Sequence, residues 1–311
     1  MSGRVTILTG GVGGAKLALG LCHAISASDV TAVVNTGDDF THLGLAISPD
    51  IDTLLYTLAG KSNSTQGWGR ANETWTFMEA VRSLGGEDWF ALGDGDLALH
   101  VIRTQRLRQG HPLSAIIADL ADAWHIAARI LPMSDNPVAT RVLTPDGELD
   151  FQHYFVRDRC APVIRAIRFA GAESARAAPG VVESIRDEQS RAILIAPSNP
   201  FLSVDPILAV PSIRQALLET RAPVVAVSPI VAGDAVKGPT AKIMRELGLE
   251  VSARTVSRHY GDLIDGILVD ERDPPVALDV TAARADTLMK SLEDRVRVAR
   301  AALELADSLR K

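Results

Sequence analysis

Short apolar runs separated by helical stretches recur along this chain. The runs are rich in β-branched residues and lack the alternation of half-exposed strands, which is typical of strands buried on both faces of a sheet. Strands of this kind alternating with helices predict an α/β fold, namely a Rossmann-like, mainly parallel sheet with helices on both faces. The expected strands are Val5–Leu8, Thr31–Val34, Thr140–Leu143, Ala192–Ala196, Val224–Val227 and Ile267–Val269.

Residues 53–131 depart from this pattern, because helical spacing replaces the strand-like runs. We interpret this stretch as a helical insertion within a single α/β domain that spans residues 1–311. All four tryptophans fall in it, and they either pack in a core or provide a platform for a flat aromatic ligand. The expected helices are Leu54–Leu58, Glu73–Leu84, Leu97–Arg108 and Leu113–Trp124, and the tryptophans are Trp68, Trp75, Trp89 and Trp124.

Two further segments carry a clear signal. The dipeptide Asp146-Gly147 lies between Arg141–Thr144 and Leu149–Val156. It predicts a hairpin, which is a local antiparallel departure from the parallel sheet. Apolar side chains at helical spacing in residues 283–309 predict a packing helix, which would also suit a subunit contact.

A doubled-glycine loop, residues 10–16, follows the first expected strand and opens the first expected helix. Gly11, Gly13 and Gly14 let the backbone turn tightly, and backbone N–H groups at a helix N-terminus attract an anion, usually phosphate. Lys16 adds a positive charge beside them. The loop therefore predicts phosphate binding, with a plain tight turn as the alternative.

The loop fits neither of the two common phosphate motifs. A Walker loop needs Gly before its Lys and Ser or Thr after it, whereas Ala15 and Leu17 flank Lys16 here. The dinucleotide fingerprint fails because Lys16 stands where its third glycine belongs. The acidic residue expected at the end of the second strand is replaced by Asn35, itself a candidate binding residue. An ordinary nicotinamide-dependent oxidoreductase is thereby disfavoured.

An acidic loop follows the second expected strand and contains Asp38, Asp39, Asp50 and Asp52. Carboxylates and phosphates repel one another unless a cation lies between them. Oxygen ligands without a nearby Cys or His favour Mg²⁺. The loop therefore predicts a magnesium site. In the alternative interpretation, Asp50 or Asp52 caps the helix expected to begin near Thr53.

A second acidic motif, residues 93–96, precedes a helix that carries His100 and Arg103. Either Asp94 or Asp96 is a suitable N-cap for this helix, and capping explains one carboxylate better than two. His100 and Arg103 lie three residues apart and can share a helix face, directed either toward a ligand or toward the interior.

Polar loops also follow two later strands. Ser198, Asn199 and Pro200 come after the strand at residues 192–196. The Asn199 side chain can contact a base or ribose, or it can close an Asx turn. Lys237 follows the next strand, where its ammonium group is a candidate contact for a diphosphate.

The composition narrows the classes of partner. The net charge of −6 and the pI near 5.7 argue against nucleic acid. No apolar run has the length of a membrane span and no signal-peptide pattern is present, so we expect a cytoplasmic protein without a membrane partner. Cys22 and Cys160 provide neither a disulfide framework nor a zinc site.

Taken together and in order, these loops resemble the transferases of coenzyme F-420 biosynthesis known as 2-phospho-L-lactate transferases, with a bacterial form that uses phosphoenolpyruvate. The resemblance implies a homodimeric, Mg²⁺-dependent enzyme. A guanylyl-activated three-carbon phosphoacid would be its donor and the deazaflavin Fo its acceptor, and GMP would be released. The segments that carry the resemblance are Thr9–Lys16, Val34–Ala59, Trp89–Gly110, Leu131–Val142, Ala196–Arg214 and Val225–Gly248.

The resemblance also implies roles for residues of this chain. Metal ligands would be Asp38 and Asp52, with Asp50 as a third, and Asp52 and Asp50 would be the catalytic carboxylates, Asp52 nearest the attacking hydroxyl. The other implied binding residues are Gly11, Gly13, Gly14 and Lys16 for the donor phosphates, Ser198, Asn199 and Pro200 for guanosine, and the segment with Asp94, Asp96 and His100 for the deazaflavin.

One position departs from the family pattern, which often has Arg or Lys where this chain has Gly95. A contact to Fo or to the donor is then either missing or supplied by Arg70 or Arg103. A second interpretation comes from a related family of bacterial gluconeogenesis factors, which share the glycine loop and bind a UDP-sugar as regulators. The motifs at residues 48–53 and 94–103 favour the transferase.

Overall fold

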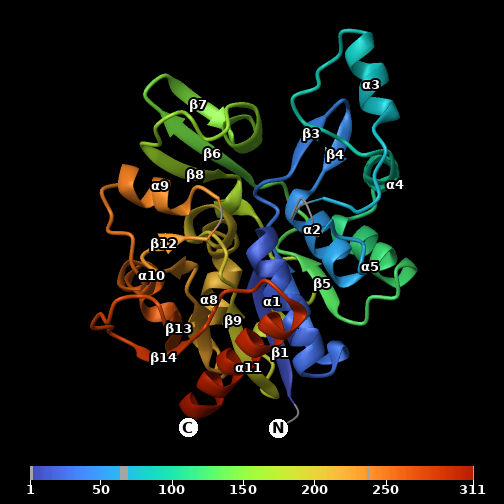
Figure 1. Cartoon of the computed structure of the whole chain (residues 1–311). Coiled ribbons are helices and arrows are strands. Elements are labelled where there is room, and N and C mark those ends of the chain that lie inside the picture. The colour runs from blue at the N-terminus through green and yellow to red at the C-terminus, as the bar shows by residue number, and fades with distance from the viewer. Residues whose placement is uncertain (1–2, 64–68, 237, 311) are drawn as a thin grey trace.

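The computed structural model describes residues 3–63, 69–236 and 238–310. Within them, seven parallel strands form one sheet in the order β14-β13-β10-β9-β1-β2-β5 (Figure 1). This sheet confirms the predicted Rossmann-like α/β class. Its strands are β1 (Arg4–Thr9), β2 (Val30–Val34), β5 (Arg129–Pro132), β9 (Ser190–Ile195), β10 (Val224–Val227), β13 (Gly266–Asp270) and β14 (Thr281–Ala285).

Helices cover both faces of the sheet, because successive side chains of each strand point to opposite layers. In β1, Ile7 belongs to one buried cluster and Leu8 to the other. The cluster with Ile7 contains side chains of α1 (Gly11–Ala24), α2 (Pro49–Leu58), α5 (Leu113–Ala123) and α11 (Leu292–Leu309). The cluster with Leu8 contains those of α6 (Val181–Ile185), α7 (Asp205–Leu208), α8 (Pro211–Glu219), α9 (Thr240–Glu246) and α10 (Ala253–Tyr260).

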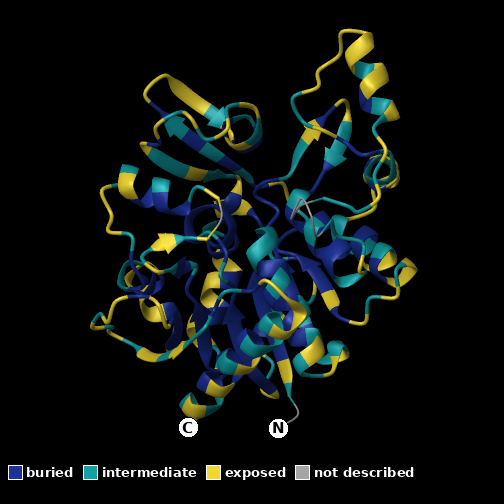
Figure 2. Cartoon of the chain, in the orientation of Figure 1, coloured by how far each residue is buried: buried dark blue, intermediate teal, exposed yellow. Residues whose placement is uncertain are grey.

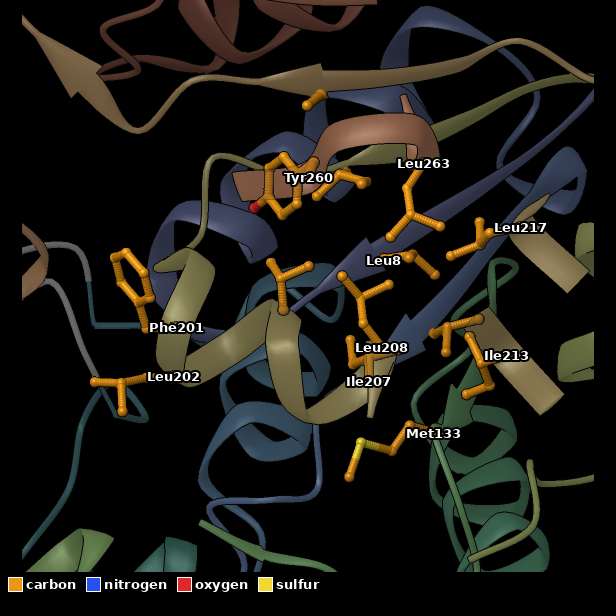
Figure 3. Close-up of a cluster of buried hydrophobic side chains, with 14 of the residues drawn as sticks. Leu8, Met133, Phe201, Leu202, Ile207, Leu208, Ile213, Leu217, Tyr260 and Leu263 are labelled. Carbon is orange, nitrogen blue, oxygen red and sulfur yellow. The ribbon is translucent and has the colours of Figure 1, made fainter. Parts of the chain in front are cut away.

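Figure 3 shows part of the second cluster. Leu8 of β1 lies beside Ile207 and Leu208, which come from α7, and Tyr260 and Leu263 approach from the segment around α10. The α7 segment directly follows the loop after β9. Its apolar packing therefore anchors one of the loops that the sequence analysis proposed for ligand binding.

Smaller elements stand at the carboxyl ends of the parallel strands (Figure 1). One group is the hairpin β3 (Phe40–His42) and β4 (Leu45–Ile47) with helices α3 (Thr76–Ser83) and α4 (Asp94–Arg108). The other is the antiparallel sheet of β6 (Ala139–Thr144), β7 (Gly147–Asp150) and β8 (Ala166–Ala170), while β11 (Ile230–Val231) pairs with β12 (Asp234–Ala235). Figure 2 shows that the outer parts of both groups are largely exposed.

One expected strand of the main sheet was placed wrongly, and one strand was missed. Residues 140–143 lie in β6, which is antiparallel to β7 and β8, and their burial alternates because one face is exposed. The third strand on this side of the main sheet is β5 instead. It is only four residues long, begins with an exposed arginine and ends in proline, so it gives little strand signal.

The predicted hairpin at Asp146-Gly147 is confirmed, although its second strand ends at Asp150 and continues as helical turns. The C-terminal prediction was too long at its start. Residues 281–285 form the exposed edge strand β14, and α11 begins at Leu292 after a capping box of Ser291 and Asp294. Within the described residues, no single helix is long and apolar enough to cross a membrane.

We predict that Gly20→Ala destabilises the protein. Alanine is normally the better helix former. In this helix, α1, a Cβ atom at position 20 would collide with the carbonyl group of Arg295 in α11. Overpacking of this kind costs about 1–3 kcal/mol. A lower urea midpoint is therefore expected, and an unchanged or higher midpoint would show that the two helices do not approach as described.

Candidate functional site

The strand order reverses between β1 and β9, because the chain builds outward on one side through β2 and β5 and on the other through β10 and β13. Loops that leave such neighbouring strands form the ligand-binding crevice of open parallel sheets. Here the glycine loop and the loop after β9 are joined directly. The Ser198 hydroxyl donates to the Gly10 carbonyl oxygen at 2.7 Å and accepts from the Gly10 N–H at 3.3 Å.

The glycines are required by the close approach of these loops. A Cβ atom on Gly13 would lie 2.7 Å from the Pro197 carbonyl oxygen, and one on Gly14 would lie 2.7 Å from the Ser198 hydroxyl. Gly11 has a φ of +63°, which favours glycine. The tight-turn interpretation is therefore confirmed, and phosphate binding by the same loop stays a prediction.

A carboxylate from α2 occupies the N-terminal end of α1. Asp50 accepts from the Gly11 N–H at 2.8 Å and from the Asn35 side-chain amide at 2.9 Å. The Asn35 carbonyl oxygen in turn accepts from the Gly37 N–H at 2.7 Å. Burial raises the pKa of Asp50 to about 6, and the two hydrogen bonds oppose that rise. Asn35 thus orients Asp50 in the structure.

Asp38 and Asp39 complete an acidic group around Asp50. Burial, followed by repulsion from Asp50, raises the pKa of Asp38 well above its usual range, and its carboxylate accepts from the Thr140 hydroxyl at 3.3 Å. Burial also raises the pKa of Asp39. One Asp39 oxygen accepts from the Ser48 hydroxyl at 2.7 Å, while its other oxygen is buried without a hydrogen-bond partner.

The helix that carries Asp50 and Asp52 begins earlier than predicted. It starts at Pro49, with Ser48 at the N-cap position, so both aspartates lie in its first turn. Neither aspartate is the cap, which corrects the alternative interpretation. Proline is well suited to this position, and the helix dipole favours carboxylates in the first turn. A two-residue spacing directs Asp50 toward Gly11 and leaves Asp52 facing α4.

Asp52 is paired with a buried arginine. Arg103 of α4 is completely buried, and its two terminal nitrogens both donate to the Asp52 carboxylate, one of them at 3.1 Å. Burial raises the pKa of Asp52, and the guanidinium charge opposes that rise. His100 lies on the same face, with Nδ1 3.4 Å from a terminal nitrogen of Arg103. The predicted shared face of His100 and Arg103 is therefore confirmed, and it is directed inward.

Asp96 extends this group toward the surface. Its carboxylate accepts from the Tyr56 hydroxyl and lies 3.1 Å from His100 Nε2. One ligand atom from each of Asp52, Asp96 and His100 lies within 4.8 Å of the others, so the three residues could hold a metal ion. The structure brings Asp96 together with Asp52, while its contact with the deazaflavin stays a prediction.

Asp94 binds the N-terminus of α3, whereas the sequence analysis considered it as a cap of the helix that carries His100. It is the first residue of α4, but its carboxylate accepts from the N–H groups of Thr76 and Phe77 at the start of α3. Glu73 returns the contact by accepting from the Gly95 N–H at 2.6 Å. Arg70 lies against Gly95 and would collide with any Cβ there, so it fills the space of a side chain at position 95.

In the loop after β9, the Asn199 side chain caps the following helical turn and keeps one buried donor without a partner. The Asn199 carbonyl oxygen accepts from the N–H groups of Phe201 and Leu202, which confirms the Asx-type interpretation. Its Nδ2 atom is buried without a hydrogen-bond partner. Pro200 is buried and begins a helical turn. Asn199 can therefore still donate a hydrogen bond to a ligand.

Of the two lysines proposed as phosphate contacts, the structure describes only Lys16. The Lys16 ammonium group donates to the Met289 carbonyl oxygen at 2.8 Å, which ties the end of the glycine loop to the segment before α11. Lys237 lies outside the described residues, as does Trp68.

The remaining tryptophans mostly pack in cores. Trp75 packs against the small cluster of Ile47, Met78 and Leu92, and Trp124 packs against the cluster on the α1 face. Trp89 instead lies between β3 and the segment after β7. Its ring centroid is 5.0 Å from that of His42 and 4.8 Å from that of His153.

Sequence reasoning missed Tyr56 and Thr140, which contact the candidate carboxylates. Tyr56 lies four residues after Asp52 in the same helix, a spacing that could have suggested a shared face. No sequence pattern indicates the contact of Thr140 with Asp38, because Thr140 lies in a separate sheet and is far from Asp38 in the sequence.

Comparison with known proteins places this geometry in a family. The family model for 2-phospho-L-lactate transferase CofD matches residues 5–304. A protein of Streptomyces griseus named phosphoenolpyruvate transferase is 44% identical over 318 residues, covering 99% of both chains. Proteins of the same name from Thermobifida fusca and Mycolicibacterium smegmatis are 42% and 40% identical, over 99% and 97% of this chain.

A crystal structure of a Bacillus halodurans protein shares the fold. It has a TM-score of 0.64 at 17% identity, and the match covers 97% of this chain and all of that protein's chain. Since the family model and the full-length relatives agree, this chain belongs to the 2-phospho-L-lactate transferase CofD family and is a transferase.

Proposed function

We propose that this transferase moves a phosphoenolpyruvyl group from a guanosine-diphosphate-linked donor to the terminal ribityl hydroxyl of the deazaflavin Fo, with release of GMP. The observation that carries the proposal is the full-length identity to proteins named phosphoenolpyruvate transferase. The name of these relatives favours phosphoenolpyruvate over 2-phospholactate or 3-phosphoglycerate as the acid. The reversal of strand order between β1 and β9 supports a nucleotide-linked donor, because open parallel sheets bind ligands in a crevice at such a point.

The donor would lie along that crevice. Gly13 and Gly14 would offer backbone N–H groups to its phosphates, beside Lys16. Gly11, whose N–H donates to Asp50, would instead let the backbone turn close to them. Ser198, Asn199 and Pro200 would border the guanosine, where the spare Asn199 Nδ2 is a donor for a ligand oxygen. Lys237 remains a proposed phosphate contact. Residues 53–131 would form part of the acceptor pocket within a single domain, with Asp96 and His100 at its wall.

Asp38 and Asp50 suit a magnesium ion, with Asp52 next to them in the first turn of α2. Their fit rests on the unpartnered, buried oxygen of neighbouring Asp39 and on the mutual repulsion of Asp38 and Asp50, which a cation would relieve. Bound there, Mg²⁺ would neutralise charge on the donor diphosphate. The protein's own contribution is to align the hydroxyl with the donor phosphorus and to exclude water.

Asp52 is the proposed acceptor of the hydroxyl proton. Its raised pKa makes it a better proton acceptor than an exposed aspartate, and Arg103 fixes the direction of its carboxylate. Assembly as a homodimer and residence in the cytoplasm remain part of the proposal. Light scattering of the purified protein tests the dimer.

The direct test of the reaction combines optical and mass measurements. Purified protein is mixed with Fo, Mg²⁺ and each guanylyl-activated acid in turn. Phosphoenolpyruvyl transfer should yield GMP and a product with the mass of Fo plus that group. A protein that binds a UDP-sugar but leaves Fo fluorescence unchanged would instead be a regulator, and the proposed reaction would be wrong.

We expect Asp52→Asn to lower kcat by about 10²–10⁴-fold, because a positioned proton acceptor contributes that much. Fo binding, followed by its fluorescence, should change little. Asp88→Asn, at an exposed ion pair with Arg82, is the matched control and should keep normal turnover. Near-normal turnover by Asp52→Asn would refute its assignment as the proton acceptor.

Binding of Mg²⁺ should tighten as the pH rises from about 5 to 8. Asp50 has a pKa raised to about 6, and those of Asp38 and Asp39 are also raised. At pH 5 these groups hold protons that a cation must displace, whereas at pH 8 Asp50 is ionised. Calorimetry in buffers of different ionisation enthalpy should report proton release on binding near pH 6. Affinity independent of pH would exclude these carboxylates as ligands.

A further inference from the structure

The four buried carboxylates at the crevice fall into two groups that differ in their partners. Asp52 receives both terminal nitrogens of Arg103, a permanently charged guanidinium. Asp50 receives only neutral donors, the Gly11 N–H and the Asn35 amide. A hydroxyl is likewise the hydrogen-bond donor to Asp38 and to Asp39.

Several contacts hold the Arg103 side chain beside Asp52. Its side chain is 0% exposed, and one terminal nitrogen also donates to the Ala46 carbonyl oxygen of β4 at 3.3 Å. The next residue, Thr104, accepts from the Ala46 N–H at 2.7 Å and donates to the His100 carbonyl oxygen. Helix α4 is therefore held against β4 beside Asp52, and the guanidinium has little freedom to withdraw.

The surroundings of His100 also disfavour a metal ion beside Asp52. The group Asp52, Asp96 and His100 has the spacing of a metal site. However, His100 Nδ1 lies 3.4 Å from Arg103, and Tyr56 donates to Asp96. A guanidinium already supplies positive charge at the centre of this group. A divalent cation placed there would be repelled by Arg103 at short range in a medium of low dielectric constant.

We propose that Arg103 takes the place of a metal ion at Asp52, so that the divalent cation binds on the Asp38–Asp50 side and Asp52 is not a metal ligand. This changes the ligand set that the family resemblance implies. Arg103 is then a positioning residue: it neutralises Asp52 and fixes its carboxylate toward the crevice. The role of Asp52 in transfer rests on the proposed function, whereas the division of the carboxylates does not.

Titration with Mn²⁺ at pH 8, without any substrate, tests which aspartates bind the cation. Binding is measured as the loss of the electron paramagnetic resonance signal of free Mn²⁺. Asp50→Asn should weaken binding by about tenfold or more, because a charged ligand is lost. Asp52→Asn, two residues away in the same helical turn, should weaken binding clearly less than Asp50→Asn does, because it removes a nearby charge but no ligand. Equal weakening by both variants would overturn the proposal.

The converse variant is Arg103→Gln, which leaves Asp52, Asp96 and His100 without their cation. It should bind a second equivalent of Mn²⁺ that the wild-type protein does not bind. If this variant folds poorly, Mn²⁺ should raise its melting temperature more than that of the wild type. Mn²⁺ stoichiometry and stabilisation equal to those of the wild type would show that Arg103 does not occupy a metal position.

A turnover measurement separates positioning from mere structural support. Arg103→Lys keeps the positive charge but loses the planar fork. It should lower kcat while the KM for the donor and the Mn²⁺ affinity stay within about threefold of the wild type. An unchanged kcat would contradict the positioning role. Absence of any Fo product with the wild-type protein would refute the proposed function, while the Mn²⁺ results would still decide the ligand set.

Discussion

Burial of like charges at one point is the constraint on which the rest of the structure depends. Four aspartates lie together where the strand order reverses, and burial raises the pKa of each. Such a group is costly unless its charges are paired or hydrogen-bonded. The glycine loop, Ser48 at the N-cap of α2, Asn35 and Arg103 all contribute donors to it. The site is thus assembled from segments that the sheet brings together.

This arrangement explains why the glycines matter beyond their turn. They let the loop after β9 and the Asp50 carboxylate approach the backbone at the end of β1. A carboxylate, held by Asn35, already meets the N-terminus of α1. The proposed donor diphosphate would therefore meet negative charge, which a cation between the two would neutralise. The same logic links the proposed magnesium site to the proposed donor.

The elements above the sheet connect the buried aspartates to the region proposed for the acceptor. Helix α4 carries Arg103 inward and Asp96 outward, and its start is fastened to α3 by Asp94 and Glu73. Arg70 fills the space at Gly95, so a basic group lies at that position even though the sequence has glycine there. The acceptor pocket proposed here would therefore be shaped by contacts between loops far apart in sequence.

The sequence by itself determined the fold class and the glycine turn, because buried parallel strands and tight turns leave local marks in residue type and spacing. It also indicated the shared face of His100 and Arg103, which follows from helical periodicity alone. It missed β5 and misplaced residues 140–143, because a short strand and a half-exposed strand differ in pairing rather than in composition. Only the tertiary structure decided that Arg103 pairs with Asp52 and that Asp50 meets Gly11. Those partners come from separate elements, and no local pattern records which distant charge will neutralise a buried carboxylate.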